Sequence, residues 1–200
     1  LNRLQAFTAT NAGLPEIAGS LAHALTDHAE PLAGTVSWQQ RLEYLRGSSA
    51  LEGELRPRTS ILGEIAAAQG VLVQGARYLA SVANRLEGNN TYSDFVTQTA
   101  QRRAQLYVGG QDGFLHAFDA RSAAETFAFI PSSVLPHLLH STTQQYRAGD
   151  YRMGRPAVAD VYDGQQWRTI LVSSVGAGGS GLFALDITHP DAIELLWELD

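Results

Sequence analysis

Two pairs of residues in this chain have types and spacings that could support chemistry. His137 and His140 lie three positions apart in a segment predicted to be helical, a spacing that some metal-ligand pairs use. No carboxylate of that helix accompanies them, so an exposed helix face is the favoured interpretation. His116 and Asp119 also lie three apart, but in a predicted strand, where alternation places their side chains on opposite faces. We therefore expect no catalytic pair there and interpret His116 as packed or solvent-facing.

Several other polar or glycine-rich segments have a structural interpretation. Gly176–Gly181 could cradle an anion, but it leads from one predicted strand into another, whereas a phosphate loop leads into a helix. Asp119 and Asp186 are interpreted as turn residues whose side chains accept backbone N–H bonds. Asn89–Thr91 matches a glycosylation sequon, but we interpret Asn90 as a helix cap.

A search for calcium ligands and for a nucleophile gives no candidate. Asp150, Asp160 and Asp163 are too dispersed for a calcium loop, which alternates several oxygen-bearing residues around a glycine. Ser132 and Ser133 are not part of a nucleophile elbow. The sequence therefore assigns no catalytic, cofactor-binding or metal-ligating residue, and we predict that the protein is not an enzyme.

Composition excludes further classes of chemistry. The 200 residues are 44% hydrophobic and 17% charged, with 14 arginines, no lysine, no cysteine and a formal net charge of −6. Lysine- and cysteine-dependent catalysis is excluded. Scattered arginines in an acidic chain make nucleic acid an unexpected partner, and no apolar run approaches the roughly 20 residues that span a bilayer. The chain starts at Leu1 without a signal-peptide pattern, so we expect it to be part of a longer protein.

Helical spacing dominates the part of the chain before about residue 104. The first predicted helix starts at Pro15 and continues to His28. The second starts at a Ser37/Gln40 capping box and stops at Gly47. The third starts at Asn90, runs through Thr99 and ends in Arg102 and Arg103, whose positive charges suit a helix C-terminus.

From Gln105 onward the hydrophobic period becomes two, and one strand pattern occurs twice. An Asp112-Gly113 turn of predicted type I′ joins the first two strands of the first copy. Glycine-rich residues join the corresponding strands of the second copy. The predicted strands are 70–74, 106–110, 114–119 and 125–130 in the first copy, and 156–162, 170–174, 182–186 and 194–198 in the second.

This internal repeat predicts a mainly β fold, a partial quinoprotein-like β-propeller of about two blades, in preference to a β-sandwich. The repeat exceeds the roughly 40 to 50 residues of a blade, so each copy is expected to carry added segments. We predict a helical segment over 1–69 and propeller blades over 70–200. The first blade spans 70–131 with a helical insertion, an insertion with a short helix over 132–140 spans 132–155, and the second blade spans 156–199. The small-residue pairs Gly109-Gly110 and Ser173-Ser174 are expected where strands crowd together.

Several segments between residues 38 and 199 form an ordered set of motifs. They are 43–47, 56–65, 108–119, 125–131, 167–172, 176–179, 183–188 and 196–198. In this order they resemble the C-terminal region of the PilY-type, also called PilC-type, type IV pilus biogenesis factors and tip adhesins. Two positions depart from the pattern of that family, because Met153 replaces an aspartate and Gln111 replaces an asparagine.

The resemblance implies a quinoprotein-type propeller displayed at the cell surface, at a pilus tip or outer membrane, with passage through the periplasm. It implies a non-enzymatic role in which the protein promotes pilus extension, opposes retraction and mediates attachment to host or abiotic surfaces. Pilins and minor pilins are the implied partners. Calcium is the ion implied by the family, through an aspartate-rich loop that is not visible in this sequence, so no metal ligand is transferred. Binding specificity is expected on insertions such as 131–155.

Two other functions remain open at this point. A quinone-cofactor dehydrogenase shares the strand–Asp-Gly–strand pattern, although the lack of Cys and Lys argues against it. An outer-membrane assembly scaffold of the propeller type would share only the fold.

Two further expectations follow from the blade interpretation. Replacing Trp197 by Ala should cost about 3 to 5 kcal/mol if that side chain is buried, and exposed strand edges should promote self-association.

Overall fold

The computed structural model describes residues 6–7, 36–45, 47–65, 69–134, 140–146, 152–176 and 180–199. The helix predicted from Pro15 to His28 lies outside these residues, as do His137, Asp150 and residues 177–179.

The first sheet is antiparallel and has the strand order β1-β5-β4-β3-β2. Its four consecutive strands agree with the predicted segments to within about two residues, because each run is rich in β-branched and aromatic residues. The edge strand β1 was not predicted. It pairs Ala6 with Phe129. The strands are β1 (Ala6–Phe7), β2 (Val71–Val73), β3 (Gln105–Gly109), β4 (Leu115–Asp119) and β5 (Glu125–Phe129).

The second sheet consists of four consecutive antiparallel strands in the order β6-β7-β8-β9. All four strands were predicted, and β7 starts three residues earlier than expected, at Trp167. Buried residues alternate along β7, where Thr169, Leu171 and Ser173 face inward. The strands are β6 (Ala157–Tyr162), β7 (Trp167–Ser174), β8 (Leu182–Asp186) and β9 (Glu194–Leu199).

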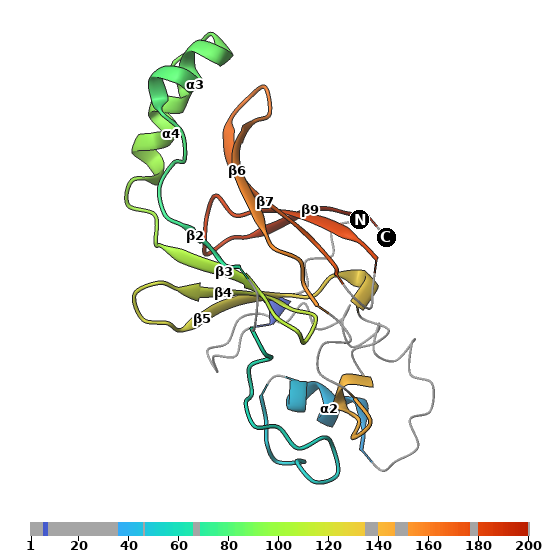
Figure 1. The fold of residues 1–200 in the computed structure, drawn as a ribbon. Coiled ribbons are helices and arrows are strands. Elements are labelled where there is room, and N and C mark those ends of the chain that lie inside the picture. Colours follow the sequence, from blue (N-terminus) through green and yellow to red (C-terminus); the bar gives the residue numbers. More distant parts are fainter. Residues whose placement is uncertain are drawn as a thin grey trace.

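The two sheets lie side by side and share one hydrophobic core (Figure 1). Phe129 of β5 and Phe183 of β8 are both fully buried, and their ring centroids are 4.8 Å apart. Leu115 and Leu171 enter the same core from the two sheets. Neighbouring sheets that bury their facing residues in this way confirm the predicted mainly β class.

The hairpin between β3 and β4 was predicted correctly, but its turn type was wrong. The Gly110 N–H donates to the Phe114 carbonyl at 2.8 Å, which closes a three-residue loop. Gly113 has a positive φ, whereas Gln111 and Asp112 do not, so a type I′ turn is excluded. The Asp112 carboxylate instead accepts the Phe114 N–H at 3.2 Å.

The helix α2 (Trp38–Leu45) has the predicted boundaries at both ends. The Ser37 N–H donates to Gln40 Oε1 at 2.8 Å, and the Gln40 N–H donates to Ser37 Oγ at 3.3 Å. Both bonds of the capping box are thus formed. At the other end, Gly47 has a positive φ, and the Ser48 N–H donates to the Glu43 carbonyl, as in a Schellman motif.

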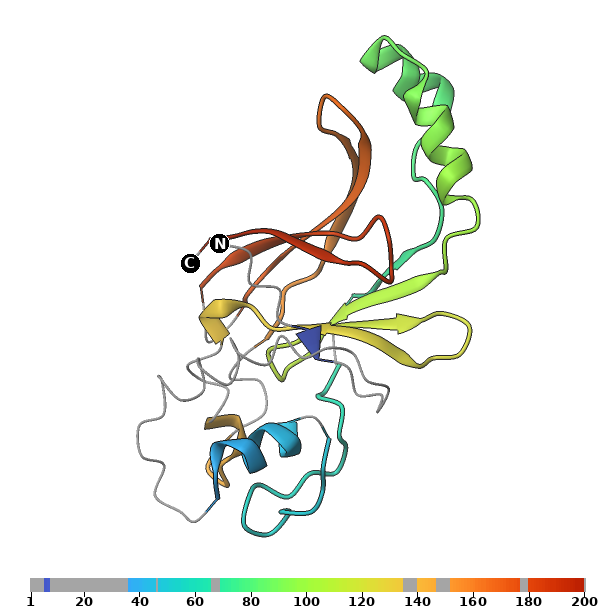
Figure 2. The same cartoon turned by 180° about the vertical axis from the view of Figure 1, so that it is seen from behind.

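A helical hairpin, α3 (Ala80–Glu87) followed by α4 (Thr91–Thr99), lies between β2 and β3 and projects beyond the sheets (Figure 2). Helix α3 was not predicted. Asn90 occupies the N-cap position of α4 without a side-chain bond. Asn89 Oδ1 accepts the Thr91 N–H at 2.9 Å instead. The predicted end at Arg102 and Arg103 was wrong, because α4 ends at Thr99 and has no basic residue in its last turn.

Only the two ends of the short helix predicted over 132–140 lie among the described residues. They belong to two 3-10 turns, η1 (Ser132–Val134) and η2 (His140–Thr142), while residues 135–139 lie outside the described part of the chain. Residues on both sides of the glycine-rich turn belong to paired strands, which agrees with a hairpin. Trp197 is 41% exposed, so the condition for a large effect of its replacement is not met.

The predicted crowding at the small-residue pairs is present, although the neighbour is a connecting segment and not another strand. Residues 152–154 run between the ends of β3 and β7. The Met153 N–H donates to the Gly110 carbonyl at 3.1 Å, and the Gly154 N–H donates to the Ser174 carbonyl at 2.7 Å. A Cβ on Gly109 would lie 2.4 Å from the Met153 Cβ, so this close approach requires glycine.

Candidate functional site

A nearly buried histidine, His116, lies in β4 next to the β3–β4 loop. Its side chain is 6% exposed and lies between two carboxylates. The Nδ1 atom is 2.6 Å from Glu125 Oε1, and the Nε2 atom is 3.3 Å from Asp112 Oδ2. Phe114 and Phe118 stack near the imidazole, with centroid distances of 5.6 and 5.9 Å. The ring is thus held in place both by charge and by packing.

The two carboxylates decide the charge state of His116. Burial alone would lower the pKa of the imidazole, but hydrogen bonds to Asp112 and Glu125 outweigh burial and raise the pKa to about 9. Both ring nitrogens therefore carry protons at neutral pH and donate to the carboxylates. A protonated imidazole cannot act as a general base, so the arrangement is suited to an ion-paired structural contact.

Asp112 joins this cluster to the segment that follows α2. Its Oδ2 atom accepts the Gly63 N–H at 3.0 Å, and the Gln111 N–H donates to the Glu64 carbonyl at 3.0 Å. A Cβ on Gly63 would lie 2.2 Å from Asp112 Oδ2, and one on Gly110 would lie 2.2 Å from Oδ1. The carboxylate therefore fits between two positions where no side chain is tolerated.

A cavity of about 600 Å³ lies next to Asp112, walled by residues 56–65, the β3–β4 loop and Tyr146. Its two arginines already contact neighbouring groups. Arg58 donates to the carbonyls of Tyr44 and Ser48, both at 2.7 Å, and lies over the Tyr44 ring. Arg56 Nε donates to the Ser141 carbonyl at 3.1 Å. These contacts give both guanidinium groups a structural role in the cavity wall.

A second buried polar network centres on Asp160 of β6, which is 4% exposed. Its Oδ2 atom accepts the Tyr92 hydroxyl at 2.6 Å and the Arg77 N–H at 2.7 Å, and its Oδ1 atom accepts the Thr169 hydroxyl at 2.9 Å. Burial and the bond to Asp160 raise the pKa of the Tyr92 phenol. This carboxylate therefore fastens the helical hairpin to the second sheet.

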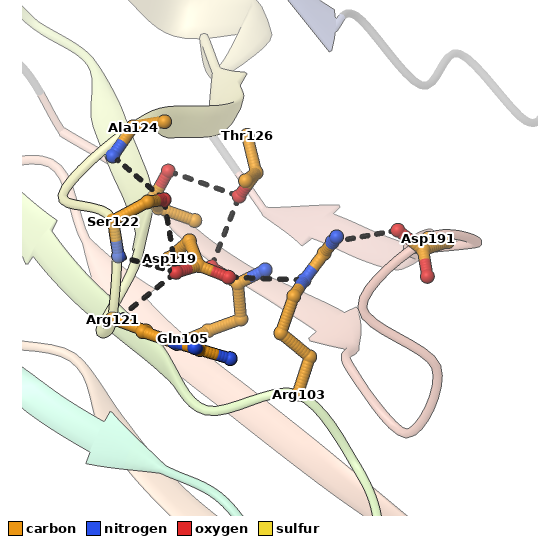
Figure 3. Close-up of polar contacts among 9 residues, drawn as sticks. Arg103, Gln105, Asp119, Arg121, Ser122, Ala124, Thr126 and Asp191 are labelled. Atoms are coloured by element: carbon orange, nitrogen blue, oxygen red, sulfur yellow. Dashed lines mark hydrogen bonds and ion pairs between the residues drawn. The ribbon is translucent and has the colours of Figure 1, made fainter.

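The two arginines after α4 bridge the sheets. Arg102 donates to the Gln74 and Gly75 carbonyls, to Thr169 Oγ1 at 2.8 Å and to the Thr188 carbonyl at 3.3 Å. Burial lowers its pKa, and Asp160 acts in the opposite direction. Arg103 lies between the carboxylates of Asp119 and Asp191, at 3.7 and 2.6 Å (Figure 3). Both arginines were predicted to favour the C-terminal end of a helix. Instead, they connect segments that are distant in sequence.

The aspartates predicted as turn residues were identified correctly. Asp119 Oδ1 accepts the N–H groups of Arg121 and Ser122 at 2.9 and 2.7 Å (Figure 3). The bonds from Ser122 hold the pKa of this carboxyl below its usual range. Asp186 Oδ1 accepts the Thr188 N–H at 2.9 Å. The structure does not bring Asp119 to His116, which pairs with Asp112 and Glu125 instead.

Metal ligation has no candidate in the part of the chain that the structure describes. No group of three or more His, Asp or Glu side chains is arranged there to hold an ion. Asp160 is bonded to hydroxyl and amide groups, and Asp163 accepts the Gln165 and Gln166 N–H groups. The described residues therefore do not fit the calcium loop that the resemblance implies.

Sequence reasoning missed the ion-paired His116 and the buried Asp160. A weak signal existed for the first, because Asp112 lies in a predicted hairpin loop, His116 lies in the strand that follows it and Glu125 opens the next strand. For the second, the predicted hairpin could place Thr169 opposite Asp160, but the partners Arg77 and Tyr92 are far away in the chain. Among the described helices, none combines the length and apolarity needed to cross a bilayer.

Each of the two packed antiparallel sheets contains four strands that are consecutive in the chain, as the blades of a β-propeller do, and the family model that matches the chain assigns it to the β-propeller class. The family model of the PilY1 beta-propeller domain matches residues 62–200, and the chain belongs to this family.

Curated relatives and a solved structure agree with the family assignment. The chain is 40% identical over 164 residues to the type IV pilus biogenesis factor PilY1 of Pseudomonas aeruginosa (strain UCBPP-PA14). It is 42% identical over 164 residues to a PilY1 homolog of Xylella fastidiosa (strain Temecula1 / ATCC 700964). Each match covers 80% of this chain and 14% of the relative. The crystal structure of the Pseudomonas aeruginosa PilY1 C-terminal domain aligns with a TM-score of 0.52 and 43% identity, covering 64% of this chain and 25% of that chain.

Proposed function

We propose that this chain is a non-enzymatic propeller section of a type IV pilus assembly factor. The observation that carries the proposal is the match of residues 62–200 to the PilY1 beta-propeller domain, in a chain whose relatives are named type IV pilus biogenesis factors. The chain spans 14% of the length of those relatives, so the activity of the whole protein is part of the proposal.

In this proposal the protein acts at the cell surface, after passage through the periplasm, as a pilus-tip adhesin. It promotes pilus extension, opposes retraction and mediates attachment, with pilins and minor pilins as partners. Calcium regulation belongs to a loop elsewhere in the full-length protein. The contacts of the described residues support a mechanical role, because His116, Asp160, Arg102 and Arg103 each join one segment of the fold to another.

The test replaces Asp160 by Ala in the chromosomal gene for the full-length protein, with Asp163→Ala as the matched control. Asp160 fastens the helical hairpin to the second sheet, whereas Asp163 is exposed and, among the described residues, bonds within its own turn and to Arg168. We expect fewer surface pili, smaller twitching zones and weaker attachment for the first variant alone. A complete deletion that leaves all three measurements unchanged would contradict the proposal.

Two further assays separate the alternative functions. Quinone titration of the purified protein with a dye-linked dehydrogenase assay should give no turnover, and turnover that depends on the quinone would favour a dehydrogenase. A deletion strain that loses outer-membrane proteins while keeping its pili would favour an assembly scaffold.

A further inference from the structure

A groove of about 440 Å³ lies between α4, the β6–β7 hairpin and the segment that follows β8. This volume falls within the range of about 300–1,000 Å³ that is typical of small-molecule sites. The groove is separate from the His116 cluster and its neighbouring cavity, with which it shares no lining residue. None of the residues of the Asp160 network lines this groove either.

One aromatic side chain, Trp167, provides the groove with a fixed apolar surface. Its Nε1 atom donates to Thr91 Oγ1 at 3.1 Å. The Tyr92 ring contacts it edge-on at a centroid distance of 4.5 Å, and the Tyr162 ring lies at 5.4 Å. These contacts hold the half-buried indole in one orientation, so stacking a ligand on it costs little conformational entropy.

Side-chain amides surround this indole. Gln98 of α4 and Gln165 and Gln166 of the β6–β7 hairpin are exposed and line the groove. Their side-chain amides form no hydrogen bond within the part of the chain that the structure describes. Each amide offers two donors and an acceptor, and such groups match the mixed donor and acceptor character of hydroxyl groups.

The charges in the groove favour a ligand without negative charge. Asp94 and Glu194 contribute exposed carboxylates. The guanidinium of Arg168 is already bonded to Asp163 at 2.9 Å and to Asp186 at 2.8 Å. Carboxylates accept strong hydrogen bonds from hydroxyl groups but repel anionic ligands. His189 lies at the rim and can donate or accept one bond.

We propose that this groove binds a neutral sugar, with a pyranose face stacked on Trp167 and its hydroxyls bonded to Gln98, Gln166 and the carboxylates. An extended peptide is a weaker match, because peptide grooves use a free strand edge or a row of apolar pockets. Sugar binding would specify the attachment role proposed for this chain. The existence of the site does not depend on that role, whereas the use of the site in the cell does.

The test measures sugar binding by the purified full-length protein, using titration calorimetry with methyl glycosides of glucose, galactose and mannose, and with N-acetylglucosamine. N-acetylneuraminic acid serves as the acidic probe and an unglycosylated peptide library as the peptide probe. We expect at least one neutral sugar to bind. Gln98→Ala and Gln166→Ala should each weaken binding about tenfold, as expected for one lost hydrogen bond at a solvated site.

Gln101→Ala is the matched control, because Gln101 is exposed, follows α4 by two residues and does not line the groove. Circular dichroism and the unfolding midpoint establish that each variant is folded. The proposal is overturned if no neutral sugar binds, if only the acidic sugar or a peptide binds, or if Gln98→Ala weakens binding no more than Gln101→Ala. Piliation is measured in a separate strain experiment, so a failure of sugar binding is distinguishable from a failure of the pilus-assembly proposal.

Discussion

The His116 cluster and the Asp160 network solve the same problem in different ways. The His116 cluster uses residues within one hairpin and the next strand, and it compensates two carboxylates with one buried positive charge. The Asp160 network uses hydroxyl and amide donors from three separate segments around one carboxylate. The local polar cluster therefore depends on charge and pH, whereas the connection between distant elements depends on neutral donors whose protonation does not change near neutrality.

The largest expected effect comes from breaking the network between distant elements. Asp160→Ala leaves the Tyr92 and Thr169 hydroxyls and the Arg77 N–H without their acceptor, which should lower the free energy of unfolding by about 4 kcal/mol. Urea unfolding measures this loss. Asp163→Ala should cost less than about 1 kcal/mol, and equal losses for the two variants would show that the network has no special role.

The second largest loss of stability is expected when the positive charge of the His116 cluster is removed. His116→Gln keeps a polar side chain but leaves Asp112 and Glu125 without their cation, and it should lower the free energy of unfolding by about 3 kcal/mol at pH 6.5. Asp112 retains the Gly63 and Phe114 amides, so the loss should stay below that of Asp160→Ala. A variant as stable as the parent would contradict the ion-paired assignment.

The third expected effect is a pH dependence that only the His116 cluster should produce. Since the folded pKa of His116, about 9, exceeds the unfolded value of about 6.5, its contribution is fully present below pH 6.5 and is lost as pH rises through 9. Between pH 6.5 and 8 the loss should be about 1.5 kcal/mol in urea unfolding. His116→Gln should flatten this slope, whereas Asp160→Asn should leave it in place.

The smallest expected effect concerns an edge strand that belongs to neither cluster. Trp197 of β9 is 41% exposed, so Trp197→Ala should lower the free energy of unfolding by less than about 1 kcal/mol. A loss of 3 kcal/mol or more, seen in the thermal midpoint, would show that another segment buries this side chain. Because β9 is an edge strand of its sheet, we still expect the chain to self-associate, and sedimentation of the purified chain can measure this.

Several features with local causes were predicted correctly from the sequence, whereas the turn type at Asp112-Gly113 and the side-chain cap at Asn90 were not. The capping box at Ser37 and the αL glycine at Gly47 need only neighbouring backbone groups, and both were identified correctly. The strands of the second sheet were equally evident, because each alternates or is uniformly apolar between turn residues.

Residues whose partners are distant in sequence were not predictable in the same way. Arg102 follows a helix and suits its dipole, but the bonds it forms with Thr169 and Thr188 require the second sheet to be in place. The pairing of His116 with Glu125 depends on the β4–β5 register, which has an irregularity next to Ala117. Such contacts become visible only when the fold has brought the strands together.

The polypeptide that joins the two sheets leaves and returns at points that are both fastened to the second sheet. Glu198 accepts the Ser132 N–H at 2.9 Å and its hydroxyl at 2.5 Å, and Gly154 is bonded to Ser174. The described residues between these anchors also hold the scaffold together, because Val134 and Met153 lie in the hydrophobic core and Thr142 accepts a hydrogen bond from the Arg41 guanidinium of α2. A foreign epitope or reporter peptide grafted into this connection would therefore keep the fold only if it retained residues 134, 140–146 and 153.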